Sequence, residues 1–530
     1  MRMLNKLAMV FGGMTAFNSL SFASATQQTE VEITGRWLKG DMHVHTALSA
    51  DATSTLADVL TKGLTTFDLD FIAVSNHLRN NSRDNVGLEG ISTLYSVASA
   101  IHELPTLQQY QQKLTDKLLI SSFEWDVPTH DHMNIGMLIP LENSQQKLAQ
   151  TAYFEYRFGA KNVATDFSQQ QLEHFKHLGI TRQNSTHNDT VAALKWLQNQ
   201  YPTNAYAALN HPTRNAKSYS IRDIREFNDV APDVFFLLEG MVGNQFNGER
   251  GDYNDSSLAG LLGGVDPIVA EVGGNWDALL GEGRHIWNIA NSDHHFKTVE
   301  PYSSGYFPGE YAKTYVYVDS KNSSDINYFT WLEALKKGNS FAVYGDLINT
   351  LDFNITSENE QATMGQKLIV EPQQKITISI RVKQAKTNNF EVKVGNEQYY
   401  GSVPALHHLD IIAGDVAEKA TSNTRAYGKP HNTSTQVLHS FTDQDWKVDE
   451  EGYYSMSYTM IATKDQYFRL RGTNLGYNEK GLTINGEPQR SVVIKPDKEG
   501  SQDYYQRINR RNYRDLWFYS NPIFTRLLIK

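Results

Sequence analysis

The 530-residue sequence contains no cysteine. This absence excludes disulfide bonds, thiolate ligands and a cysteine nucleophile, so any metal site must use histidine, aspartate, glutamate and water. The sequence also lacks a Gly-x-Ser-x-Gly motif, the turn that carries the serine nucleophile of many hydrolases. Beyond residue 25, no apolar run is long enough for a membrane helix. The net charge of −10 argues against general binding to nucleic-acid polymers or anionic membranes.

The N-terminal stretch has the pattern of a secretory signal peptide. A basic start with Arg2 and Lys6 precedes a short apolar stretch, residues 7–22, and small residues at 23–25 form a cleavage pattern. We expect cleavage after Ala25 and a periplasmic or secreted protein with no membrane anchor. An uncleaved anchor is the alternative, but glycine and asparagine interrupt the apolar stretch.

Seven short apolar segments follow, most of them separated by helical or long loop segments. This alternation is typical of an α/β fold, and we expect a parallel TIM-like βα barrel over residues 33–345. A helix is predicted over 186–199, and another begins near residue 55 with Thr53 or Ser54 as its cap. The predicted strands are 36–45, 68–77, 118–123, 132–139, 206–210, 234–238 and 286–292.

From about residue 346 the pattern changes to strands separated by glycine, asparagine and proline. A strand at 314–318, a helix over 324–337 ended by Gly338 and a strand at 340–345 complete the predicted barrel region. We expect a β-sandwich-like domain over 346–530. Its aromatic-rich segment 515–524 is predicted to pack against the barrel, with a sugar-binding platform as the alternative. The clearest strands of this region are 376–382, 390–394, 409–412 and 466–471.

Histidines and carboxylates stand at the ends of most predicted barrel strands. His43 and His45 are two residues apart on an extended strand, so both side chains point to the same face. In a βα barrel the carboxyl ends of the strands share one mouth, where such residues would meet. His132 is an exception because it starts its strand, so the barrel must be irregular. The candidate metal ligands are His43, His45, Asp51, His77, Glu124, His132, His211, Asp293 and His295.

A ligand set of this size suits two or three divalent ions of the Zn²⁺, Mn²⁺ or Fe²⁺ type. A carboxylate such as Glu124 can bridge two of them. Three alternatives stay open: Asp51 as an ordinary loop acid, His130 in place of His132, and His294 in place of His295.

Three charged residues beside these candidates are predicted to contact substrate. Arg79 and Arg214 closely follow His77 and the His211-Pro212 pair, so each can bind a substrate anion or lie on the surface. Glu239 closes a predicted strand at the same mouth. It can face the substrate, support a ligand or shape a turn.

Taken in order, these motifs resemble the PHP (polymerase and histidinol phosphatase) metallohydrolases. The resemblance spans about residues 38–345, and residues 311–345 further resemble the carbaryl-hydrolase-like branch. It rests on His43-Val44-His45-Thr46 with Asp51, Val74-Ser75-Asn76-His77, Glu124, His132-Met133-Asn134-Ile135-Gly136, Asn210-His211-Pro212 and Asn291-Ser292-Asp293-His294-His295.

The resemblance implies a distorted seven-stranded barrel with a di- or trinuclear metal site. One position departs from the family, because Asn76 stands where an aspartate is common and brings no charge to the third metal. The implied sets are His43, His45, Glu124 and Asp293 for one metal, Glu124, His132 and His211 for a second, and Asp51, His77 and His295 for a third.

These features together predict an exported metal-dependent hydrolase that uses a metal-bound hydroxide as nucleophile. We expect a phosphoesterase acting on a small anionic ester, because Arg79 and Arg214 would favour that substrate. Hydrolysis of a carbamate, carboxyl ester or amide is the alternative, and a noncatalytic binding protein is a third. Asp293 is a candidate for proton transfer, and His294 for the acid that protonates the leaving group.

Overall fold

The computed structural model has a mixed α/β fold in which two sheets carry the predicted barrel strands. No helix among the described residues is long and apolar enough to cross a membrane. The predicted signal peptide and the predicted strand 390–394 lie outside the described residues. The structure describes residues 35–215, 219–253, 260–295, 305–320, 326–358, 360–385, 405–495 and 501–528, without the side chain of Gln502.

Three parallel strands at one end of the first sheet confirm the beginning of the predicted βα pattern. They are β1 (Arg36–Val44), β2 (Phe71–Val74) and β5 (Leu118–Ser121), in the order β1-β2-β5. Every residue of β2 and β5 is buried, as expected for strands covered on both faces. The second strand ends three residues earlier than predicted. His77 therefore lies in the loop that follows it.

The second sheet has five strands, and one of them runs against the predicted direction. Strand β7 is antiparallel to both of its neighbours, β6 and β8, while β8, β9 and β10 are parallel. An antiparallel strand begins where its neighbours end, so His132 at the start of β7 lies at the same edge as their carboxyl ends. The strands are β6 (Phe123–Asp126), β7 (His132–Met137), β8 (Ala205–Leu209), β9 (Phe235–Met241) and β10 (Trp287–Ala290).

Single backbone bridges connect these two sheets. Val44 at the end of β1 pairs in parallel with His294, and His77 pairs in parallel with Glu124 of β6. Both bridges lie at or just beyond the carboxyl ends of β1 and β2. The polar segments that follow strands of the two sheets are therefore brought to one place.

Helices accompany these strands, and their ends follow local capping signals. The first helix is capped by Thr55, whose hydroxyl accepts from the N–H of Asp58, so the predicted caps Thr53 and Ser54 are wrong. The predicted helix at 186–199 is confirmed. The helices are α1 (Leu56–Thr61), α2 (Tyr95–Ala98), α3 (Leu104–Lys113), α4 (Ser144–Phe158), α5 (Gln169–His177), α6 (His187–Gln200), α7 (Ile221–Val230), α8 (Pro267–Ala270), α9 (Asn275–Leu280), α10 (Tyr328–Lys337) and α11 (Gln502–Arg514).

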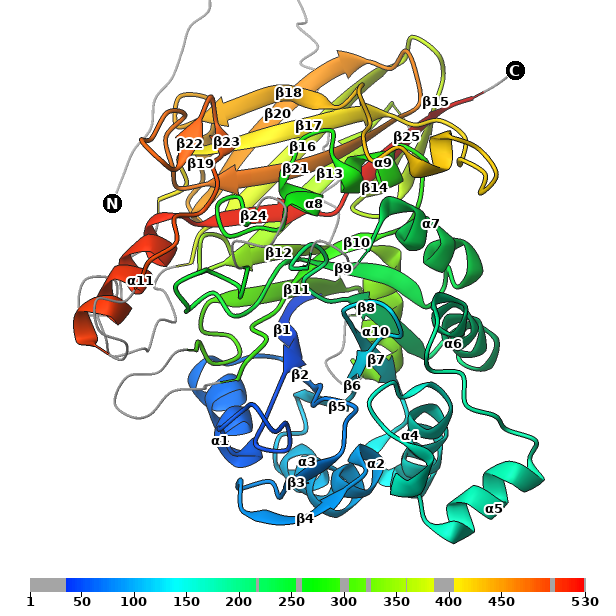
Figure 1. Ribbon diagram of the computed structural model, residues 1–530. Coiled ribbons are helices and arrows are strands. Elements are labelled where there is room, and N and C mark those ends of the chain that lie inside the picture. The colour runs from blue at the N-terminus through cyan, green and yellow to red at the C-terminus, as the bar shows by residue number, and fades with distance from the viewer. Residues whose placement is uncertain are drawn as a thin grey trace, which may run out of the picture. The chain divides into compact units, whose positions relative to one another are not determined.

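The C-terminal part of the chain extends the sheet that contains β1. Strand β11 pairs with β1, β12 pairs with β11, and β24 from the C-terminal end pairs with β12, all antiparallel (Figure 1). With five further strands from residues 367–527, eight strands extend this sheet beyond β1. They are β11 (Ala312–Val318), β12 (Ser340–Tyr344), β15 (Lys367–Val370), β17 (His408–Asp415), β18 (Gln436–Thr442), β21 (Gln466–Thr473), β24 (Trp517–Ser520) and β25 (Ile523–Leu527).

A separate five-stranded sheet lies within the predicted C-terminal β region. Residues on β13 and β16 alternate between buried and partly exposed, which is typical of a sheet with one covered face. The strands are β13 (Thr350–Thr356), β14 (Gln361–Thr363), β16 (Lys375–Lys383), β19 (Lys447–Val448) and β20 (Tyr453–Ile461). Two short hairpins, β3 (Asn81–Arg83) with β4 (Glu89–Thr93) and β22 (Thr483–Ile484) with β23 (Glu487–Pro488), stand apart.

The aromatic C-terminal segment is part of the core. Trp517, Phe518 and Tyr519 of β24 are fully buried and belong to the hydrophobic cluster that also contains the residues of β12. The prediction that this segment packs against the preceding region is confirmed. An exposed aromatic platform for sugars does not form there.

Candidate metal centre

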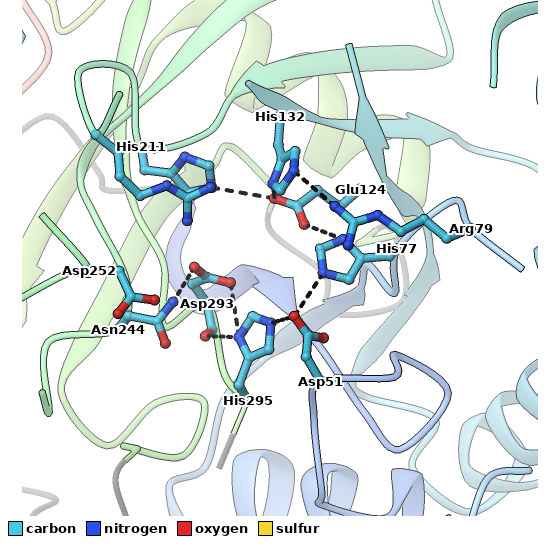
Figure 2. A pocket seen from close by; sticks show the side chains of 11 residues that line it. Asp51, His77, Arg79, Glu124, His132, His211, Asn244, Asp252, Asp293 and His295 are labelled. Carbon is cyan, nitrogen blue, oxygen red and sulfur yellow. Dashed lines mark hydrogen bonds and ion pairs between the residues drawn. The ribbon is translucent and has the colours of Figure 1, made fainter. Parts of the chain in front are cut away.

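A cavity of about 110 Å³ lies where the polar segments of the two sheets meet. Seven of the nine predicted ligands line it, and Figure 2 shows their side chains directed toward one another. The other two, His43 and His45, are fully buried and contact the lining residues Glu124 and Asp293. The lining consists of Asp51, His77, Arg79, Glu124, His132, His211, Arg214, Asn244, Asp252, Asp293 and His295.

Glu124 is the centre of this cluster, and five histidines surround its carboxylate. Its Oε1 lies 3.1 Å from Nε2 of His43, 2.9 Å from Nδ1 of His132 and 3.4 Å from Nε2 of His211. Its Oε2 lies 2.8 Å from Nδ1 of His77 and 3.4 Å from Nε2 of His45. The two oxygens thus face different histidines, the arrangement that lets one carboxylate bridge two ions.

Three predicted ligands converge with the spacing of a tetrahedral metal site. Nε2 of His43 lies 3.1 Å from Nε2 of His45 and 3.1 Å from Oδ1 of Asp293, which is itself 3.3 Å from Nε2 of His45. Metal–ligand bonds of 2.0 to 2.1 Å place tetrahedral donors about 3.3 Å apart. Together with Glu124, these residues match the first set that the family resemblance implies.

The other two implied sets also come together, with differences. Oδ2 of Asp51 lies 3.3 Å from Nε2 of His77 and 3.5 Å from Nε2 of His295, as the third set requires. Around His132 and His211 the structure adds a carboxylate that we did not predict, Asp131. Donor atoms of those three residues lie within 4.8 Å of one another.

Several polar atoms of the cluster are buried without a hydrogen bond among the described residues. They are both ring nitrogens of His211, Nδ1 of His77 and Oδ1 of Asp293. Leaving such atoms unpaired costs free energy unless another partner satisfies them. Buried nitrogen and oxygen atoms such as these four, which converge and lack a hydrogen bond, fit metal ions. The residues present could therefore hold a metal, although they do not identify it.

The two buried histidines are oriented by hydrogen bonds on the side away from the cluster. Nδ1 of His43 lies 2.7 Å from Oε2 of Glu239, and Nδ1 of His45 lies 2.9 Å from Oγ of Ser49. Each bond places the proton on Nδ1, so the lone pair of Nε2, on the side of Glu124, is free to bind a metal. Glu239 is fully buried and does not line the cavity, so its contact with His43 fits ligand support among the roles considered for it.

The asparagine that departs from the family pattern does not face the cluster. The Oδ1 of Asn76 accepts from Thr46 and Ser49, and its amide donates to Oε2 of Glu103 at 3.0 Å. An aspartate here would place a second carboxylate against buried Glu103. The side chain at 76 serves the loop after β1, so the asparagine removes no ligand from the third set.

Two ligands follow strands on strained backbone. His211 has φ 30° and Asp293 has φ 46°, in the left-handed region that non-glycine residues seldom occupy. Gly243 makes the second conformation feasible, because a Cβ there would lie 2.2 Å from Cβ of Asp293. Such backbone strain is typical of functional sites.

Both predicted arginines line the cavity, and each is held by a carboxylate that sequence reasoning missed. Arg79 makes a two-bond ion pair with Asp126 at 2.6 and 2.5 Å, and Arg214 lies 2.9 Å from Asp131. Burial opposes ionisation of Asp126, but hydrogen bonds from His132 and Arg79 lower its pKa to about 2. Both guanidinium groups therefore sit at the cavity wall in a fixed orientation.

Two histidines considered as alternatives lie elsewhere. Nδ1 of His294 contacts the carbonyl oxygen of Tyr306 and its Nε2 contacts Ser54, both at 2.9 Å. Burial lowers the pKa of His294 to about 4. Since it does not line the cavity, its assignment as the leaving-group acid is wrong. His130 contacts His187 at 2.9 Å, and His132 is the residue that contacts Glu124.

Some residues that line the cavity or contact its lining were not predicted from the sequence. Asp126 and Asp131 flank predicted ligands closely in sequence, two residues after Glu124 and one before His132. Asn244, whose amide donates to Oδ2 of Asp293, lies in an irregular loop that offered no signal. The other missed residues are Ser49 and Asp252.

Comparison with known proteins adds no family. No protein-family model matches the chain, and no curated protein matches it.

Proposed function

We propose that this protein is a metal-dependent hydrolase, most favourably a phosphoesterase. The observation that carries the proposal is Glu124 with its five histidine neighbours at 2.8 to 3.4 Å, beside two guanidinium groups in one cavity. Borderline divalent ions prefer such nitrogen and carboxylate donors.

The resemblance to the PHP metallohydrolases also supports a proposal for the fold. We propose a distorted PHP-type barrel formed by β1, β2, β5 and β6 to β10, with the strands after residue 345 as an appended β region. The order of the strands in the two sheets and the bridges Val44–His294 and His77–Glu124 support a ring. The antiparallel β7 supports its distortion.

We propose two or three zinc, manganese or iron ions at this centre. His43, His45, Glu124 and Asp293 would hold the first. Asp51, His77 and His295 would hold another, and Glu124, His132 and His211, with Asp131 beside them, would hold the remaining one. Ions bound there would supply a nucleophile at neutral pH by lowering the pKa of water and would polarise the scissile bond.

The chain's own residues define the substrate that fits. Arg79 and Arg214 would bind the anionic oxygens of a phosphoryl group and orient it, since guanidinium groups pair with such oxygens through two hydrogen bonds. The cavity of about 110 Å³ would admit a small reacting group. These features favour a small anionic ester.

Asp293 is the remaining candidate for moving protons. Its Oδ1 faces three histidines at 3.1 to 3.3 Å, and its Oδ2 accepts from Asn244. Both oxygens are engaged, so we assign Asp293 the role of ligand first. Glu239 and Ser49 hold His43 and His45 in place and do not touch the substrate.

The proposal is tested by turnover of three aryl substrates side by side: a phosphomonoester, a phosphodiester and a carbamate. Protein loaded with Mn²⁺ or Zn²⁺ should hydrolyse a phosphoester, and the His43→Ala/His45→Ala variant should not. Glu155→Gln is the matched control, because this buried carboxylate bonds the backbone N–H groups of Tyr95 and Ser96, away from the cluster.

Other outcomes would change the assignment. Carbamate turnover alone would establish the alternative hydrolase. No measurable turnover of any of the three substrates by the metal-bound protein would favour a noncatalytic binding protein. We also propose export with cleavage after Ala25, which N-terminal sequencing of the mature protein tests.

A further inference from the structure

A second group of potential metal donors lies apart from the Glu124 cluster. His130 is in the turn between β6 and β7, His187 begins α6, and Asp223 is in the first turn of α7. Figure 1 shows α6 and α7 side by side. One donor atom from each of these residues lies within 4.8 Å of the others. We propose that His130, His187 and Asp223 bind a separate divalent ion of the zinc type.

The distances suit a small rearrangement around an ion. Nε2 of His130 lies 2.9 Å from Nδ1 of His187, which lies 3.8 Å from Oδ1 of Asp223. These separations fall on either side of the spacing of about 3.3 Å between donors of a tetrahedral zinc site. Shifts of about half an ångström would bring these two separations to that spacing, and water would complete the coordination.

Neighbouring groups hold each donor ready. Oε2 of Glu226 lies 3.2 Å from Nε2 of His187, so that nitrogen donates to the carboxylate and Nδ1 keeps its lone pair for a metal. Oδ2 of Asp223 accepts from the N–H of Ser220 at 2.7 Å, so Oδ1 remains on the side of His187. A carboxylate behind a histidine is the usual arrangement at protein zinc sites.

Aromatic packing fixes the two rings. His130 stacks on Tyr219 with ring centroids 5.0 Å apart and an angle of 7° between planes. His187 stacks on Phe227 at 5.6 Å. Ligands held in one orientation before the ion arrives bind it with a smaller loss of side-chain entropy.

The ion would fasten the turn between β6 and β7 to two helices. The next two residues are Asp131, which pairs with Arg214 at the cavity wall, and His132, which begins β7 and lines the cavity. Occupancy would therefore position part of the candidate metal centre without touching it. The proposal does not depend on the hydrolytic activity, because metal content and stability report it directly.

The test measures the zinc bound per chain, after equilibration with zinc and gel filtration, for the full chain and for His187→Ala. We expect the variant to bind one ion fewer and the zinc-induced rise in Tm to shrink. His177→Ala is the matched control, since this exposed histidine on α5 belongs to none of the clusters described. It should retain the wild-type metal content and Tm rise.

Asp223→Asn provides a second variant that preserves folding. The asparagine keeps an acceptor for the N–H of Ser220 but loses the charge, so α7 should stay capped while affinity for one ion falls about tenfold or more. Equal zinc content and affinity in wild type, His187→Ala and Asp223→Asn would overturn the proposal and leave a direct hydrogen bond between the two histidines. If His187→Ala does not fold, the zinc content and affinity of Asp223→Asn alone test the proposal.

Discussion

Replacing Glu239 with glutamine should weaken metal binding, although Glu239 is not itself a proposed ligand. Its carboxylate holds Nδ1 of His43 at 2.7 Å and also accepts from Asn291 at 3.1 Å and from the N–H of Gly243 at 3.3 Å. Glutamine keeps one acceptor oxygen but removes the negative charge. Loss of such a supporting carboxylate costs 10- to 100-fold in metal affinity, or about 1.4 to 2.7 kcal/mol.

The assay is zinc retention against a competing chelator, with urea unfolding in parallel. At a chelator concentration that leaves the wild type saturated, Glu239→Gln should lose at least one ion. The amide nitrogen of glutamine would face a backbone N–H, so we also expect about 1 kcal/mol less stability. Glu155→Gln, equally buried, should lose stability and retain its zinc. Equal zinc retention by folded Glu239→Gln and wild type would refute the argument.

Three further predictions concern the scaffold. Arg469→Ala should lower the free energy of unfolding by about 3 to 5 kcal/mol, because it leaves Asp277 buried without its charged partner at 2.8 Å. Chemical denaturation measures this change, and a nearly unchanged free energy would contradict the prediction. Gly338→Ala should lower stability by at least about 1 to 2 kcal/mol, because φ is 76° and its Cβ would lie 2.6 Å from Trp287; an unchanged Tm would contradict it. Burial lowers the pKa of Lys147 from 10.5 to about 8, so below pH 8 its charge destabilises the fold and the penalty fades as pH rises toward 10.5. The unfolding free energy of Lys147→Met, measured relative to that of the wild type, should thus fall by roughly 2 to 3 kcal/mol between pH 7 and pH 10. A difference between the two proteins that stays constant with pH would contradict this.

The strands were predictable from sequence where apolar runs were buried on both faces. Strands β2, β5 and β8 are such runs, and each was predicted to within a few residues. The direction of β7 was not predictable, because a buried run reads the same in parallel and antiparallel sheets. The position of His132 at its start was the one available signal. It indicated an irregularity without defining it.

Strand pairing across long stretches of sequence was also beyond prediction. The aromatic segment was predicted to be buried, but its pairing with β12 joins residues 341–343 to residues 518–520. Hydrophobicity selects which residues are buried, whereas register depends on partners that a single sequence does not identify.

The candidate ligands were predictable because most of them lie near the end of a strand, or near the start of one, at the same edge. All nine lie in the cluster. Of the groups that hold them, Glu239 was a candidate with ligand support as one of its possible roles, whereas Ser49 was not predicted. They contact the faces of His43 and His45 that point away from the cluster. Those contacts depend on tertiary packing. His294 illustrates the same limit, because its neighbour His295 enters the cluster and it does not.

The most direct test of the central claim is anomalous diffraction from crystals of the zinc- or manganese-loaded protein. The account predicts two or three peaks around Glu124, with one between His43 and Asp293 and another between Asp51 and His77. Absence of anomalous density within bonding distance of Glu124 in metal-loaded crystals would contradict it.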